Sequence, residues 1–159
     1  MDQLGRVWYR LTVVNMKILI MGLPGSGKTT LAKQLRKDLT HQHKKLVLWF
    51  NADKIRQEYN DWDFTPTGRL RQATRMNELA KCSDSDYVIC DFVCPTHTLR
   101  NIFNADYTIW VDTIDAGRFD DTNKLFVPPD IYDVKVTEQA AEKWSTIIIN
   151  TLLKYETKI

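Results

Sequence analysis

A glycine-rich segment near the start of the chain has the composition of a phosphate-binding loop. It reads Gly22-Leu23-Pro24-Gly25-Ser26-Gly27-Lys28-Thr29-Thr30 and fits the pattern Gly, four residues, Gly-Lys-Ser/Thr. Backbone N–H groups of such a loop form an anion-binding nest at a helix N-terminus, and glycine lets the backbone approach the phosphate. We predict that this loop binds ATP, with the Lys28 ammonium on the β- and γ-phosphates and the Thr29 hydroxyl on Mg²⁺. An ordinary glycine turn would leave Lys28 unexplained.

Two carboxylates follow apolar runs that we interpret as strands. Asp53 comes shortly after residues 46–50, and Asp91 directly after residues 87–90. In phosphoryl transfer, Asp53 would orient the acceptor hydroxyl, accept its proton or hold Mg²⁺ through water, and Asp91 would be a further Mg²⁺ ligand. The alternatives are an N-cap role for Asp53 on a short following helix, and a turn role for Asp91 at the strand end.

Four arginines lie within twenty residues of one another: Arg56, Arg69, Arg71 and Arg75. A guanidinium group binds phosphate or sulfate through a fork of two N–H bonds. Arg56 and Arg69 lie near the predicted strand-end loops, and we predict that they bind an anion. Arg71 we interpret as part of a solvated helix face paired with nearby acids.

Aromatic and thiol side chains accompany these charges. Phe64 and Phe92 lie in polar loops, where they would stack on an aromatic base or anchor the loops. Cys94 precedes Pro95, and only His97 is placed to activate it, so the sequence argues against covalent catalysis.

Alternating strands and helices must position these residues. Strands are predicted at 18–21, 46–50, 87–90, 107–111 and 133–136, with helices at 30–39, 55–60, 69–81, from Pro95 to about 103, and after a Thr137 N-cap. The runs are apolar on both faces, which is typical of a parallel sheet between two helix layers, with ligands at the carboxyl ends of the strands.

The polar segment at 112–130 contains Pro128-Pro129 and is predicted to be a mobile lid. Its Arg118 and Lys124 would bring positive charge onto the transferring phosphoryl group when it closes.

The bulk composition excludes several classes of protein. With 159 residues, 43% hydrophobic and 26% charged, the chain suits one globular domain, which we expect at 16–159 with the lid at about 113–130, after an extension of unknown role at 1–15. No apolar stretch reaches the ~20 residues that span a bilayer, and no secretion signal is evident. A net charge of +2 gives little support for nucleic-acid binding. The three cysteines lack metal-ligand spacing and suit a reducing cytoplasm.

From Lys17 to Pro129 the sequence resembles the adenylylsulfate (APS) kinases, which transfer the γ-phosphate of ATP to the ribose 3′-hydroxyl of adenosine 5′-phosphosulfate. The shared marks are the glycine loop extended through Leu31-Ala32, Asp53-Lys54-Ile55-Arg56, Asp63-Phe64-Thr65 with Arg69 and Arg75, Val88-Ile89-Cys90, Phe92-Val93-Cys94-Pro95, and Arg100. The resemblance implies an α/β, three-layer αβα P-loop kinase fold with a five-stranded parallel sheet and a short lid, acting on a small nucleotide with ATP and Mg²⁺. The oligomeric state stays open, a homodimer being one option.

The resemblance also implies roles for individual residues. The aspartate matching Asp53 lies beside the acceptor hydroxyl, the arginines matching Arg56 and Arg69 contact the substrate, and the phenylalanine matching Phe64 lines the adenine pocket. The full substrate-binding set expected from these arguments is Arg56, Phe64, Arg69, Gln72, Phe92, Cys94 and Phe126.

The chain departs from the family pattern at several of these positions. Asn51-Ala52-Asp53 replaces Asp-Gly-Asp, Gln72 replaces Asn, and Cys94 replaces Ser before proline. The lid is rebuilt, with Phe126 as its candidate aromatic residue. The alternatives are a kinase for another acceptor (a nucleoside, a nucleotide, or a modified base or 5′-end in DNA), or a non-catalytic nucleotide-binding module. The retained Lys28, Thr29 and Asp53 argue against the module.

Overall fold

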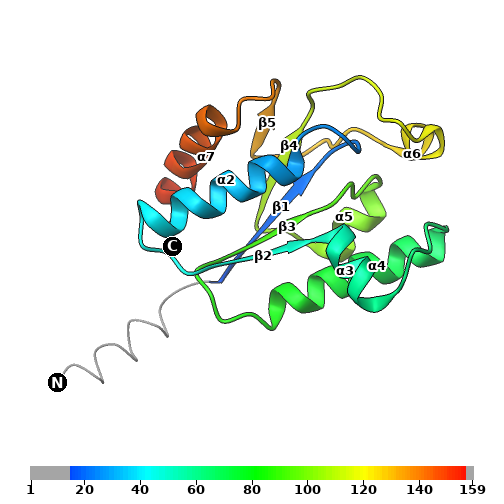
Figure 1. Ribbon diagram of the computed structural model, residues 1–159, viewed down its shortest axis with the longest axis horizontal. Helices are drawn as coiled ribbons and strands as arrows, with labels where there is room; N and C mark the ends of the chain where they lie inside the picture. Colours follow the sequence, from blue (N-terminus) through cyan, green and yellow to red (C-terminus); the bar gives the residue numbers. More distant parts are fainter. Residues whose placement is uncertain (1–14, 157–159) are drawn as a thin grey trace.

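The computed structural model describes residues 15–156, and within them one parallel sheet forms the centre of the molecule (Figure 1). Its strand order is β2-β3-β1-β4-β5, and each neighbouring pair is parallel. The strands are β1 (Met16–Met21), β2 (Val47–Asn51), β3 (Tyr87–Asp91), β4 (Tyr107–Val111) and β5 (Val134–Val136). This confirms the predicted five-stranded parallel sheet. The extension predicted at 1–15 lies, except for Asn15, outside the described residues.

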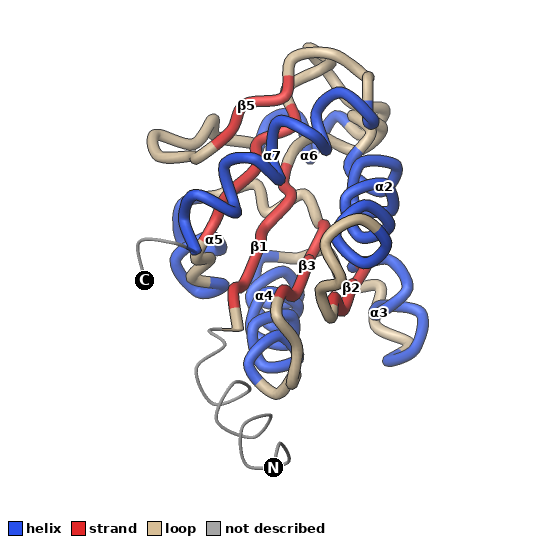
Figure 2. The backbone as a smooth tube through the Cα atoms, turned by 90° about the vertical axis from the view of Figure 1, so that its left-hand side faces the viewer, coloured by secondary structure: helices blue, strands red, loops and turns tan. Residues whose placement is uncertain are grey.

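Helices cover both faces of this sheet (Figures 1 and 2). They are α2 (Lys28–His41), α3 (Ala52–Tyr59), α4 (Pro66–Lys81), α5 (His97–Phe103), α6 (Asp120–Leu125) and α7 (Ala141–Glu156). Successive residues of β1 point to opposite faces, so Ile18 and Ile20 pack with α2 and α7, whereas Leu19 and Met21 pack with α4 and α5. Two hydrophobic layers therefore hold the sheet, and only its strand ends and loops remain for ligand chemistry.

The structure corrects the interpretation of the apolar run at 46–50 as a buried strand. β2 lies at an edge of the sheet, and the Leu48 side chain is 40% exposed. An apolar run does not reveal strand order, so the sequence pattern alone did not distinguish an edge strand from a central one.

Helix starts differ from the predictions because the capping residues differ. Thr65 caps α4 and Thr96 caps α5, so α4 begins at Pro66 and Pro95 precedes α5. Asn51 caps α3 through a hydrogen bond from Lys54 N–H. The predicted Thr137 cap is wrong, because α7 begins at Ala141.

Candidate active site

The glycine loop joins β1 to α2 in a backbone conformation that depends on glycine. Gly25 and Gly27 have φ angles of +83° and +103°, in the left-handed region. A β-carbon on Gly22 would lie 2.4 Å from the carbonyl oxygen of Val111. Gly27 occupies the N-cap of α2 and makes no side-chain cap, so the first N–H groups of this helix are available to an anion.

Lys28 begins α2 and is buried, with its ammonium group donating to the Leu23 carbonyl at 2.8 Å. Burial lowers the pKa of Lys28 to about 8, and the charges of Asp91 and Asp53 oppose this shift. A buried ammonium with a single carbonyl partner is well placed to gain from a bound phosphate.

Asp91 ends β3 and is buried among hydrogen-bond donors. Trp49 Nε1 donates to Oδ2 at 2.6 Å, the Thr29 hydroxyl donates to Oδ1 at 3.2 Å, and the Asn51 amide contacts both oxygens. Burial raises the pKa of Asp91, and the hydrogen bonds from Trp49 and Asn51, together with the Lys28 charge, act in the opposite direction.

Within residues 15–156 there is no group of three or more His, Cys, Asp or Glu side chains that could bind a metal ion without a further ligand. The Thr29 hydroxyl and the Asp91 carboxylate are nevertheless oxygen ligands of the type that Mg²⁺ prefers, and Mg²⁺ commonly binds one or two carboxylates together with substrate phosphates. This donor set therefore fits a nucleotide-bound Mg²⁺.

Asp53 lies in the first turn of α3 with its side chain exposed. Because Asn51 caps this helix, the alternative N-cap role for Asp53 is wrong. The carboxylate instead lines a cavity of about 840 Å³ at the carboxyl ends of the strands.

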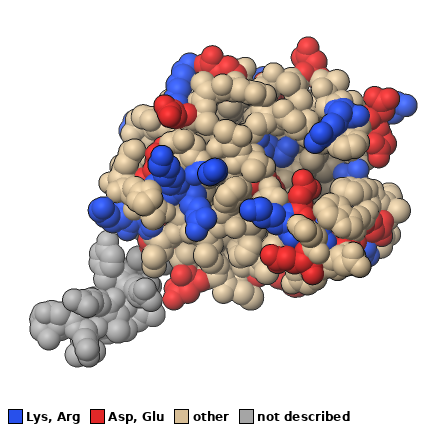
Figure 3. Space-filling view, in the orientation of Figure 1, with Lys and Arg blue, Asp and Glu red and all other residues tan. Residues whose placement is uncertain are grey.

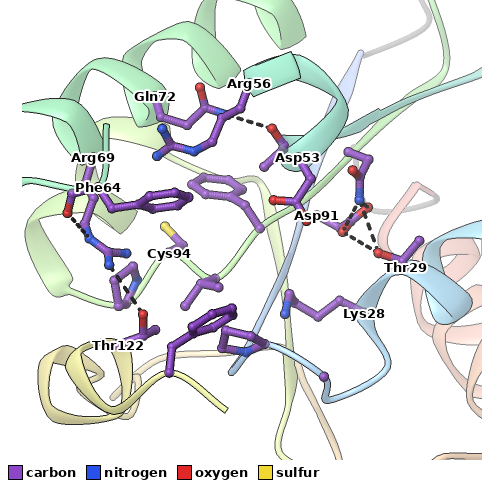
Figure 4. A pocket seen from close by; sticks show the side chains of 18 of the residues that line it. Lys28, Thr29, Asp53, Arg56, Phe64, Arg69, Gln72, Asp91, Cys94 and Thr122 are labelled. Atoms are coloured by element: carbon purple, nitrogen blue, oxygen red, sulfur yellow. Dashed lines mark hydrogen bonds between the residues drawn. The ribbon is translucent and has the colours of Figure 1, made fainter. Parts of the chain in front are cut away.

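This cavity brings together residues from the glycine loop, the strand ends, α3, α4 and the lid (Figure 4). The predicted site residues that line it are Pro24, Gly25, Gly27, Lys28, Thr29, Thr30, Asp53, Arg56, Phe64, Arg69, Gln72, Asp91, Phe92, Cys94 and Arg118. Gly22, Leu23, Ser26, Lys124 and Phe126 do not line it, although the first three belong to the backbone of the glycine loop.

Arg56 and Arg69 also hold the loop at 61–65. Buried Arg56 donates from Nη1 to the carbonyls of Asp61 and Asp63, at 3.0 and 3.1 Å, and its guanidinium lies 4.2 Å from the centre of the Phe64 ring. Arg69 Nε donates to the Phe64 carbonyl at 2.9 Å. Both predicted anion-binding residues therefore present Phe64 to the cavity.

Gln72, predicted to bind substrate, and Arg71, predicted to lie on a solvated helix face, both make structural contacts. Buried Gln72 donates to the Ala52 carbonyl at 3.1 Å and accepts a hydrogen bond from Arg75, which ties α4 to α3. Arg71 pairs with Asp61 and Asp63, which confirms that it belongs to an exposed face with acidic partners.

Cys94 and Phe92 line the cavity from the segment between β3 and α5. Cys94 is 1% exposed, and burial raises the pKa of its thiol to about 12, which argues against a nucleophilic thiolate. Phe92 makes an edge-to-face contact with Phe103 at 5.5 Å, so it anchors its segment as well as facing the cavity.

The lid contains helix α6, and some of its residues line the cavity although they were not among the predicted site residues. Phe119, 49% exposed, lines the cavity beside Arg118, whereas Phe126 packs against the core under the Arg100 guanidinium. Trp62, 52% exposed in the loop before α4, also lines the cavity. The only sequence signal for Phe119 and Trp62 was an aromatic residue within a polar loop.

Contacts join the lid to the walls of the cavity and also hold the lid together internally. Arg69 Nη2 lies 3.4 Å from the Thr122 hydroxyl. A β-carbon on Gly117 would lie 3.0 Å from the Pro24 carbonyl oxygen, so the lid packs closely against the glycine loop. The Asn123 side chain accepts from Gly117 N–H and donates to Gly117 C=O, at 2.8 and 2.9 Å.

Residues 14–113 match the family model described as adenylylsulphate kinase. The chain belongs to the adenylylsulphate kinase family. The matched segment contains the glycine loop, Asp53, the arginines of α3 and α4, and Asp91, and it ends where the lid begins.

A curated relative supports this assignment over a shorter stretch. It is a probable adenylyl-sulfate kinase of Aeropyrum pernix, 33% identical over 97 residues, which cover 59% of this chain and 52% of the relative. The chain thus spans about half the length of the curated relative that it matches.

Solved structures confirm the fold. An APS kinase from Mycobacterium tuberculosis, in complex with AMPPNP and APS, superposes with a TM-score of 0.72 at 16% identity, covering 87% of this chain and 97% of that one. A shikimate kinase from Aquifex aeolicus superposes with a TM-score of 0.63 at 16% identity, covering 89% and 99%. The three-layer fold is therefore shared by kinases whose names give different substrates.

Proposed function

We propose that this protein transfers the γ-phosphoryl group of ATP to the 3′-hydroxyl of adenosine 5′-phosphosulfate. One observation carries the proposal: a single cavity joins the phosphate-binding loop and Lys28 to Asp53 and to an arginine- and aromatic-lined wall. Such a cavity holds a donor and an acceptor in contact while limiting the access of water. Membership of the adenylylsulphate kinase family supports this choice of reaction.

The donor side would act through the glycine loop. Its backbone N–H groups and the Lys28 ammonium would hold the β- and γ-phosphates where negative charge develops. Thr29 and Asp91 would hold Mg²⁺, which neutralises charge on the phosphate oxygens when it is bound. Arg118 lines the cavity and would add positive charge near the transferring group.

The acceptor side would act through Asp53, which would orient the hydroxyl nucleophile and accept its proton. Phe64 would offer its ring to the adenine base, and Phe119 of the lid, which also lines the cavity, is a second candidate for this contact. Arg56 and Arg69 would place positive charge beside the sulfated phosphate. Roles for Lys124 and Phe126 would require the lid to bring them into the cavity.

The surface and the cysteines suit a small-molecule enzyme of the cytoplasm. On the face drawn in Figure 3, basic and acidic side chains of the described residues are interspersed and form no continuous basic stripe. Cys82, Cys90 and Cys94 are free thiols, as expected in a reducing compartment. Among the described helices, none is long and apolar enough to span a membrane.

The direct test is transfer of labelled phosphate from Mg·[γ-³²P]ATP to a panel of acceptors. The panel contains adenosine 5′-phosphosulfate, adenosine 5′-phosphate, adenosine, shikimate and 5′-hydroxyl DNA. We expect adenosine 5′-phosphosulfate to gain label at its 3′-hydroxyl, with adenosine 5′-phosphate at least about 100-fold poorer in kcat/KM because it lacks the sulfate. Preferential labelling of another acceptor would reject the substrate, and labelling of none would reject the activity.

A further inference from the structure

The Asp91 carboxylate is held by side chains of the neighbouring strand β2. Asn51 and Asp91 are paired residues in the parallel β2–β3 register, so their Cα atoms lie opposite each other on adjacent strands. Trp49 and Asn51 lie two residues apart on β2 and point to the same face, the one covered by α2. Thr29 lies in α2, so three elements converge on one carboxylate (Figure 4).

The two carboxylate oxygens of Asp91 have different surroundings. Oδ2 accepts the 2.6 Å hydrogen bond from the Trp49 indole, whereas Oδ1 lies 3.2 Å from the Thr29 hydroxyl. A short N–H bond to an ionised oxygen is a strong, directional contact. The indole therefore fixes the rotation of the carboxylate and leaves Oδ1 beside the hydroxyl group.

The orientation of the Asn51 amide is also determined. Its Oδ1 accepts the capping hydrogen bond from Lys54 N–H at 3.1 Å, so its NH₂ group must face the other way. That group lies 3.1 Å from Asp91 Oδ1 and 3.2 Å from the Thr29 hydroxyl oxygen. The cap of α3 thus determines how Asn51 contacts both candidate metal ligands.

Both β2 donors are uncharged. A lysine or arginine in their place would neutralise Asp91 and weaken its attraction for a cation, whereas an indole or amide N–H group orients the carboxylate and leaves its negative charge available. A neutral cradle of this kind is typical of the partners that orient metal ligands in proteins.

We propose that Trp49 and Asn51 are positioning residues for nucleotide-bound Mg²⁺, holding Asp91 so that its Oδ1 and the Thr29 hydroxyl form a prearranged pair of oxygen ligands. The inference rests on the proposed function only in requiring Mg·ATP as the donor. It does not depend on the identity of the acceptor.

The test compares nucleotide binding with and without the metal. The affinity for AMPPNP is measured by calorimetry in Mg²⁺ and in EDTA, with no acceptor present. Trp49→Phe keeps a ring but removes the indole N–H donor. We expect this variant to bind Mg·AMPPNP about tenfold more weakly, the lower end of the loss seen when a partner of a metal ligand is removed, and to bind AMPPNP in EDTA like the parent protein.

Two further variants make the result specific. Trp110→Phe removes an indole that makes an edge-to-face contact with Tyr132 and does not line the cavity, and it should leave both affinities unchanged. In an Asp91→Asn background, Trp49→Phe should cause little further loss of the Mg²⁺-dependent affinity, because the indole acts through that carboxylate. If Trp49→Phe does not fold, as judged by circular dichroism, Asn51→Ser decides. It keeps a capping oxygen, loses the amide donor and should show the same metal-specific loss.

Equal weakening in Mg²⁺ and EDTA would show a merely structural role and overturn the proposal. Unchanged affinity in Mg²⁺ would overturn it as well, and so would a parent protein whose AMPPNP affinity does not depend on Mg²⁺. Failure to phosphorylate adenosine 5′-phosphosulfate would reject the proposed acceptor alone, because no acceptor enters this measurement.

Discussion

The two walls of the cavity are built in different ways. The donor wall consists mainly of one contiguous loop that leads into the N-terminus of α2, where no side chain caps the first N–H groups. The acceptor wall consists of side chains from α3, α4 and the lid, which are held by hydrogen bonds to other segments, such as those of Arg69 with Thr122 and of Gln72 with Ala52. The conformation of the loop is determined by a few glycines. The positions of the side chains in the other wall depend on every element that supports them.

This difference explains why the arginines of the acceptor wall serve two purposes. Arg56 and Arg69 hydrogen-bond carbonyl groups of residues 61–64 and flank the Phe64 ring. A substitution there changes both the charge offered to a ligand and the shape of the loop. On the donor wall, the shape of the glycine loop depends mainly on its glycines, and the Lys28 side chain adds one hydrogen bond to it, donated to the Leu23 carbonyl.

The largest effect should come from removing the charge on the donor wall. Lys28→Ala should reduce kcat by about 10³-fold or more, because the developing charge on the phosphate oxygens loses its buried cation. Initial rates of phosphate transfer measure this, and thermal unfolding of the variant checks that the fold is kept. Turnover close to that of the parent would refute a role for Lys28 in phosphoryl transfer.

The next effect tests the carboxylate of the acceptor wall. Asp53→Ala should reduce kcat by about 10²-fold or more while changing nucleotide affinity little, because a general base contributes mainly in the transition state. Rates and AMPPNP affinity are measured on the same preparation. A parallel loss of nucleotide affinity would instead make Asp53 part of the nucleotide-binding site.

A smaller effect distinguishes an arginine that lines the cavity from a nearby arginine that does not. Arg69→Ala should raise the KM of the acceptor about tenfold and leave Mg·AMPPNP affinity unchanged, because it removes a charge and the support of Phe64 together. Arg71→Ala is the matched control. Arg71 and its partners Asp61 and Asp63 do not line the cavity, so we expect the KM of the acceptor to change by less than about twofold. Similar KM values for the two variants would remove the distinction between the walls.

The smallest expected effect is a pH dependence of nucleotide affinity, which arises at Lys28 on the donor wall. Since the pKa of Lys28 is lowered to about 8 and a bound phosphate raises it again, nucleotide affinity should fall as the pH rises through 8. At pH 8.5 binding should take up roughly 0.7 proton, measured by calorimetry in buffers of different ionisation enthalpy. Lys28→Met should abolish this uptake, and an unchanged uptake in that variant would assign the proton to another group.

The same shift has a consequence for stability in the absence of nucleotide. Between pH 8 and 10.5 the unfolded chain retains a proton on Lys28 that the folded chain has released. The free energy of unfolding should therefore gain a contribution that increases with pH across this window.

What could be predicted from the sequence follows the same division between the loop-built donor wall and the side-chain acceptor wall. Apolar runs and the glycine loop were sufficient to predict the sheet, the position of Lys28 and the carboxylates at the strand ends. The edge position of β2 was not predictable, because strand order depends on packing between distant segments. Phe119 and Trp62 were missed for a related reason: whether an aromatic residue in a polar loop faces a cavity depends on contacts between distant segments, such as that of Thr122 with Arg69.

The pairing of Asn123 with Gly117 bears on the predicted mobility of the lid. Two hydrogen bonds to one peptide segment close a small ring across residues 117–123, so this stretch keeps its shape independently of its neighbours. Its displacement from the cavity then requires the loss of docking contacts, such as that of Thr122 with Arg69, rather than unfolding. A lid that moves as one rigid unit would lose little conformational entropy on each closure, which favours rapid exchange of reactants and products.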